Sequence, residues 1–110
     1  DSDVTYEAKP SRKFLGAAAV PRLEAALSAL SQLDDWNEES LEDSLLTVLE
    51  TLEVKMGKLA QPIRVAVTGT SVSPGLYETL AALGRAKTLL RIGMGLEVAR
   101  QAAAVEEQGS

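Results

Sequence analysis

One stretch of the sequence, residues 55–90, combines charged and turn-forming residues in a way that could serve binding chemistry. Lys55 and Lys58 lead into it, and Arg64 follows a proline. A turn, Ser73 to Tyr77, then reads Ser-Pro-Gly-Leu-Tyr. Its serine is a favourable N-cap. A proline in the first helical position lacks an amide hydrogen, but that hydrogen would have no partner there, so we predict a helix start at this point. A basic entry followed by a Pro-Gly-aromatic turn is unusual in a purely structural helical domain, and we therefore look for function here.

Catalytic chemistry has few candidate residues in this chain. The sequence contains no His and no Cys, which removes the commonest general base, the thiolate nucleophile and the usual zinc ligands. Asp34 and Asp35 could share acid–base work, but adjacent acidic residues before a helix more often favour the helix start. We therefore predict no catalytic residues, no metal site and no cofactor within this chain.

The charge is unevenly distributed along the chain. The net charge is −5, yet residues 1–54 hold 12 acidic and 4 basic side chains, whereas residues 55–96 hold six basic side chains against Glu78 alone. Exposed charges farther apart than about 8 Å are largely screened at physiological salt, so a local patch matters more than the total. Chance segregation explains the pattern equally well.

The length and composition predict one soluble domain. A chain of 110 residues with 45% hydrophobic residues can bury a single core. No apolar run approaches the roughly 20 residues that span a bilayer, and nothing resembles a signal peptide. We expect a cytoplasmic protein that binds no membrane, with residues 1–9 and about 104–110 mobile.

Apolar stripes at helical spacing predict an all-α domain of five or six short helices. The first clear stripe runs from Pro21 to Leu33, and a second, capped by Asn37, reaches Leu52. Trp36, between them, is most simply a plug under the loop. A short helix is also predicted over residues 10–15, ending near Gly16.

Residues 63–68 alternate like a strand, but the sequence offers no second strand to pair with them, so we predict a helix with Pro62 in its first turn. Leu76, Leu80 and Leu83 predict the next helix, ended by Gly84 in a left-handed conformation. A last helix starts at Arg85, and the two glycines at 93 and 95 could break it.

The motifs resemble those of a known family. Lys55-Met-Gly-Lys58 alone is superficially similar to the ATP-site loop of class I aminoacyl-tRNA synthetases, a reading we reject because the partner motif needs His. The longer pattern closely resembles the C-terminal anticodon-binding domain of bacterial glutamyl-tRNA synthetase. It comprises Lys55-Met-Gly-Lys-Leu-Ala-Gln-Pro-Ile-Arg-Val-Ala-Val-Thr-Gly69, Ser73-Pro-Gly-Leu-Tyr77, Leu80-Ala-Ala-Leu-Gly-Arg85, and upstream Tyr6-Glu-Ala-Lys9 with Phe14-Leu15 and Asp35-Trp36.

The resemblance implies an all-α cage that grips the anticodon loop of glutamate tRNA. The catalytic domain, with its ATP and magnesium, would lie outside this chain, and the parent enzyme would be monomeric and would not bind DNA. The family's RNA-contacting positions carry over to Lys55, Lys58, Gln61, Arg64, Ser73, Pro74, Gly75, Leu76 and Tyr77. From its residue type, Leu76 could instead serve the core alone.

A second hypothesis comes from another functional class. The acidic first half could make this chain a helical protein-interaction module that docks through that half. Residues 93–110 match no pattern in the family, so the resemblance assigns them no role.

Overall fold

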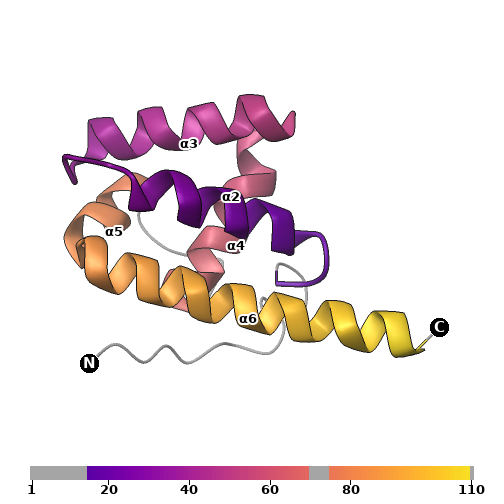
Figure 1. Cartoon of the computed structure of the whole chain (residues 1–110). Helices are drawn as coiled ribbons and strands as arrows, with labels where there is room; N and C mark the ends of the chain where they lie inside the picture. Colours follow the sequence, from indigo (N-terminus) through magenta and orange to yellow (C-terminus); the bar gives the residue numbers. More distant parts are fainter. Residues whose placement is uncertain (1–14, 70–74, 110) are drawn as a thin grey trace.

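The computed structural model describes residues 15–69 and 75–109 and contains five helices in that part of the chain (Figure 1). They are α2 (Ala19–Ser31), α3 (Glu38–Leu52), α4 (Met56–Thr68), α5 (Leu76–Leu83) and α6 (Arg85–Gly109). The described residues form no strand, so the all-α prediction is confirmed. The expectation that every helix is short is wrong for α6, which has 25 residues. No helix in the described ranges is long and apolar enough to cross a membrane.

The helices pack against one another, and α2 and α6 make the most extensive contacts. Figure 1 shows α3 along one side of the molecule, α6 along the opposite side, and α2 and α4 between them, with α5 closing one end. α4 contacts α2, α3 and α6, whereas α5 packs on α3 and α6. The leucine stripes predicted from the sequence face this interior, because Leu23, Leu30, Leu41 and Leu45 are fully buried. The far end of α6 extends beyond the other helices (Figure 1).

α4 confirms the helical prediction for residues 63–68 and corrects its start. The helix begins at Met56, so Pro62 lies in its interior rather than in its first turn. A proline there has no amide hydrogen to donate to the carbonyl of Lys58. The cost is offset by burial, since three helices cover α4 and bury most of its side chains: Leu59, Ala60, Pro62, Ile63, Val65, Ala66 and Val67. Packing on several sides overrides the strand-like local pattern.

The helix ends agree with the sequence at some points and differ at others. The Asn37 side chain accepts a hydrogen bond from the amide of Ser40 at 2.8 Å, as its N-cap role requires. Gly84 ends α5 with φ of 83° but ψ of 165°, which is an extended mirror-image conformation and not the left-handed helical cap we predicted. α5 begins at Leu76 with Gly75 as its N-cap, so the predicted cap at Ser73 is wrong.

The Trp36 side chain joins the loop between α2 and α3 to α5 by a hydrogen bond. Its indole Nε1 donates to the backbone carbonyl of Leu80 at 2.8 Å, and the half-buried ring packs against the core. The Arg85 guanidinium lies 5.7 Å from the ring centroid and donates to the carbonyls of Leu33 and Asp34. The plug interpretation is therefore confirmed, with a hydrogen bond and a cation–π contact that the sequence did not reveal.

α6 passes through both of its internal glycines without a break, and the two have different surroundings. A Cβ atom at Gly93 would meet nothing within 4 Å. A Cβ at Gly95 would lie 2.5 Å from the Cβ of Ala66 on α4 and 3.1 Å from its Cα. The absence of a side chain at Gly95 therefore permits the close approach of α6 to α4.

This difference predicts opposite effects for two matched substitutions. Gly95→Ala should lower the free energy of unfolding by up to about 2 kcal/mol, because the cost of overpacking (about 1–3 kcal/mol) exceeds the helix propensity gained (about 1 kcal/mol). Gly93→Ala should raise it by up to about 1 kcal/mol. Urea unfolding of both variants checks this, and equal stability of the two would contradict the packing described here.

Candidate nucleic-acid interface

Four of the predicted site residues lie on α4 and its N-cap. Lys55 is the N-cap, and both Lys55 and Lys58 are exposed, whereas Gln61 and Arg64 are half-buried. Because successive members are three residues apart, they form a slanting row that winds roughly half a turn around the helix. The row offers two exposed lysine ammonium groups near the helix start and two more fixed, directional side chains farther along.

Gln61 and Arg64 each bury a polar atom that lacks a partner. Gln61 Oε1 and Arg64 Nε are inaccessible to solvent and have no hydrogen-bond partner among residues 15–69 and 75–109. Native proteins contain few such atoms, and each calls for an explanation. Both belong to the predicted row, so both side chains keep unused hydrogen-bonding capacity next to the exposed lysines.

The described part of the turn meets the start of α4. The Tyr77 hydroxyl contacts Met56 Sδ at 3.8 Å, so the first turn of α5 lies beside the first turn of α4. Gly75 is exposed, whereas Leu76 is 3% exposed and belongs to the core. Of the two roles left open for Leu76, core packing is the one the structure shows. Ser73 and Pro74 lie outside the described residues.

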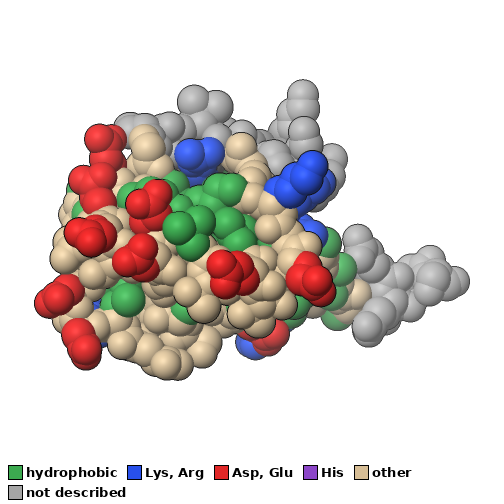
Figure 2. Space-filling view, turned by 90° about the horizontal axis from the view of Figure 1, so that it is seen from above, with side chains coloured by type: hydrophobic (Ala, Val, Ile, Leu, Met, Phe, Trp, Pro, Cys, Tyr) green, Lys and Arg blue, Asp and Glu red, His purple; other side chains and the backbone are tan. Residues whose placement is uncertain are grey.

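The basic segment does not form one continuous patch. Arg85 binds carbonyls at the end of α2, and Arg91 donates from α6 to the carbonyl of Val67 at 3.0 Å. Lys55, Lys58 and Lys87 are exposed. Figure 2 shows one face, on which acidic side chains are widely spread and Lys and Arg gather toward one edge. Two of the six basic residues therefore make structural hydrogen bonds, three are exposed surface charges, and Arg64 is half-buried.

Arg22 is a cation that the sequence analysis did not select, because it lies in the acidic half of the chain. Folding places it across from Lys58, with which it lines a small cavity. The sequence carries no signal for this pairing, since the two residues belong to different helices, α2 and α4.

Comparison with known proteins identifies the family to which this chain belongs. Residues 1–96 match the model of the anticodon binding domain family, and the chain belongs to that family. It is 47% identical over 103 residues to glutamate–tRNA ligase 1 of Alkalilimnicola ehrlichii, covering 89% of this chain and 21% of that protein. It is 43% identical over 105 residues to the glutamate–tRNA ligase of Mycolicibacterium vanbaalenii, covering 94% and 21%.

A solved structure shares the fold. A glutamate tRNA ligase from Elizabethkingia meningosepticum, crystallised in complex with its amino acid, superposes with a TM-score of 0.80 and 23% identity. The match covers 88% of this chain and 19% of that one. The chain thus spans about a fifth of the length of the proteins it matches.

Tyr77 predicts a dependence of stability on alkaline pH. Burial raises the pKa of its phenol above the ordinary value of about 10, and the carboxylate of Glu42 on α3 raises this pKa further. The folded chain therefore keeps this proton at pH values where the unfolded chain loses it. The stability that Tyr77 contributes is complete below the unfolded pKa and is lost as pH rises through the folded pKa.

We expect the free energy of unfolding to fall as the pH is raised above about 10, and to fall less steeply in Tyr77→Phe. Urea unfolding at a series of alkaline pH values measures both slopes. The two proteins differ only at this residue, so the comparison isolates Tyr77. Identical slopes would show that the folded state does not perturb this phenol.

Proposed function

We propose that this chain is the domain with which a glutamate–tRNA ligase holds the anticodon loop of glutamate tRNA. The observation that carries the proposal is the match of residues 1–96 to the anticodon binding domain family. Its curated relatives are glutamate–tRNA ligases, which points to glutamate tRNA as the substrate class. The row on α4 and the start of α5 are the surface we assign to the RNA.

The residue chemistry suits a single-stranded loop. Loop bases are splayed outward, stacked on flat side chains and read at their edges. Lys55 and Lys58 are exposed point charges suited to phosphates, whereas the half-buried Gln61 and Arg64 can direct hydrogen bonds at base edges. Tyr77, held against Met56, offers a fixed ring edge at the start of α5.

The same proposal places the other steps of the reaction outside this chain. The chain spans about a fifth of its relatives, so the amino-acid transfer, with its ATP and magnesium, belongs to a separate catalytic domain. We also propose a cytoplasmic, monomeric parent enzyme. In this scheme Ser73 and Pro74 join Gly75 as the turn that contacts the anticodon bases.

The isolated domain should bind glutamate tRNA weakly, because it lacks the contacts that the rest of the enzyme makes with the acceptor end. Its affinity should fall steeply with salt, since phosphate contacts release condensed counterions. Fluorescence anisotropy with labelled tRNA over a salt series measures both quantities. Binding that is indifferent to salt would exclude the lysines as the main contacts.

Two substitutions should separate phosphate contacts from base contacts. Lys58→Ala removes an exposed point charge, so it should weaken binding to cognate and anticodon-swapped tRNA by a similar factor and flatten the salt slope. Arg64→Ala should cost more with the cognate anticodon, because a guanidinium can bind a base edge bidentately; such contacts are worth about 1–3 kcal/mol of discrimination in DNA grooves.

Both variants are compared on the two RNAs at fixed salt, after circular dichroism shows that their helicity is unchanged. Arg64 is half-buried, so Arg64→Lys serves as a second variant that keeps the charge and the aliphatic stem but loses the planar fork. If Arg64→Ala weakens both RNAs equally, Arg64 contacts phosphate and does not read a base.

A further inference from the structure

A cavity of about 190 Å³ lies between the first turns of α2 and α4. It is several times larger than the roughly 30 Å³ that one water molecule occupies in the liquid, so it has room for a small polyatomic group. The residues that line it are small or basic, with one proline: Gly16, Ala18, Ala19, Arg22, Gly57, Lys58 and Pro62. The mixture of two cations with exposed backbone suggests an anionic occupant.

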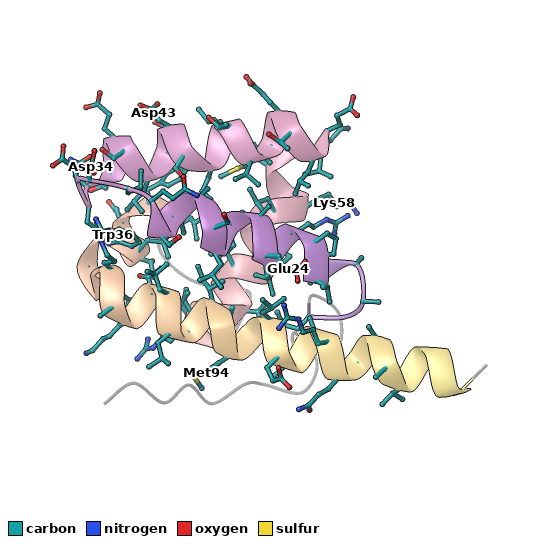
Figure 3. All side chains as sticks on the ribbon, in the orientation of Figure 1. Glu24, Asp34, Trp36, Asp43, Lys58 and Met94 are labelled. Atoms are coloured by element: carbon teal, nitrogen blue, oxygen red, sulfur yellow. The ribbon has the colours of Figure 1, made fainter. Side chains whose placement is uncertain are left out.

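Both charged side chains that line the cavity, among the described residues, are positive. Arg22 is half-buried on α2 and Lys58 is exposed on α4, and Figure 3 shows the Lys58 side chain beside the start of α2. None of the described residues that line the cavity carries a carboxylate, and neither helix has an acidic residue in its first turn. Glu24, two residues from Arg22, is bound to Arg100 at 2.8 Å. Within the described ranges, neither cavity cation forms an ion pair.

The backbone at the cavity is accessible. A Cβ atom at Gly16 or Gly57 would meet nothing within 4 Å, so a ligand can come close to the main chain at both positions. The N-caps of the two helices, Ala18 and Lys55, make no side-chain capping hydrogen bond. Helix starts carry partial positive charge, which adds to that of the two cations.

We propose that this cavity holds a phosphate group of the RNA backbone, clamped between Arg22 and Lys58. The proposal rests on the proposed function and extends it, because Lys58 also belongs to the row on α4. It makes Arg22 a contact for the same RNA, although it lies on a different helix. A phosphate held there would fix the position of the RNA backbone relative to Gln61 and Arg64, without reading sequence itself.

The test measures binding of an anticodon stem-loop RNA of glutamate tRNA to the whole chain over a salt series. Arg22→Gln should weaken binding roughly three- to tenfold and reduce the slope of log K against log salt by about 0.7–0.9. Arg22→Lys should recover most of the slope. Lys87→Gln is the matched control, because Lys87 is exposed on α6 outside the cavity; it should change both quantities less.

A double variant tests whether the two cations share one phosphate. If they do, Arg22→Gln combined with Lys58→Gln should weaken binding by less than the product of the single losses. The shared phosphate would be excluded if the double variant weakened RNA binding by the full product of the two single effects. It would also be excluded if Arg22→Gln weakened binding no more than Lys87→Gln does. Circular dichroism of each variant excludes loss of folding, and Lys58→Gln alone changes only an exposed side chain.

The outcomes separate this proposal from the proposed function. Suppose that Arg64 still discriminates cognate from anticodon-swapped tRNA, but Arg22→Gln leaves the salt slope unchanged. The cavity would then be excluded as a phosphate site, and the proposed function would be retained. No RNA binding by the unmodified chain at any salt would overturn both. A titration with inorganic phosphate, followed by the amide shifts of Gly57 and Lys58, identifies the ligand source. Binding of free phosphate without any effect of Arg22→Gln on RNA would show an anion site unrelated to RNA.

Discussion

The contact between Ala66 and Gly95 sets how closely α4 can approach α6. With no side chain at Gly95, the two helices meet at a distance that a Cβ atom would forbid. The same pair of helices is joined by Arg91, which donates to the carbonyl of Val67 near the end of α4. α4 is therefore held to α6 through its last turn, which limits the movement of α4 relative to the rest of the domain.

That rigidity matters for the proposed binding of RNA. Directional contacts discriminate only if their donors are already in place, because ordering them on binding costs conformational entropy. The second part of the site is held in the same way. α5 receives the Trp36 indole and the Thr88 hydroxyl on the carbonyl of Leu80, and Tyr77 contacts Met56 at the start of α4. Neither half of the site can shift without disturbing several contacts.

The sequence predicted the all-α fold because four amphipathic stripes are long and regular, and because the strand-like residues 63–68 have no second strand to pair with. It misplaced Pro62, because a stripe gives the face of a helix but not where the helix begins. It likewise placed the start of α5 at Ser73, where the serine and proline preferences favoured it, but the helix begins at Leu76. Single-residue cap preferences are worth about 1 kcal/mol and are readily outweighed by packing.

Some features of the candidate site depend on contacts between residues far apart in the sequence, and these features could not be predicted from the sequence. From the sequence, Arg85 and Arg91 were counted as exposed basic residues, but both donate hydrogen bonds to backbone carbonyls of other elements. Arg22 read as part of the acidic half, yet it faces Lys58 across a cavity. The row from Lys55 to Arg64 was selected through a family resemblance, and the structure shows its exposure and the unpartnered polar atoms within it.

Chemical-shift mapping of this chain with an anticodon stem-loop RNA of glutamate tRNA would show which surface of the domain binds the RNA. Amide shifts should concentrate from Lys55 to Arg64 and from Gly75 to Tyr77, and the outward face of α3 should change little. Shifts centred on the acidic side chains of α3, or a response that is the same for an unrelated RNA hairpin of equal length, would contradict this prediction.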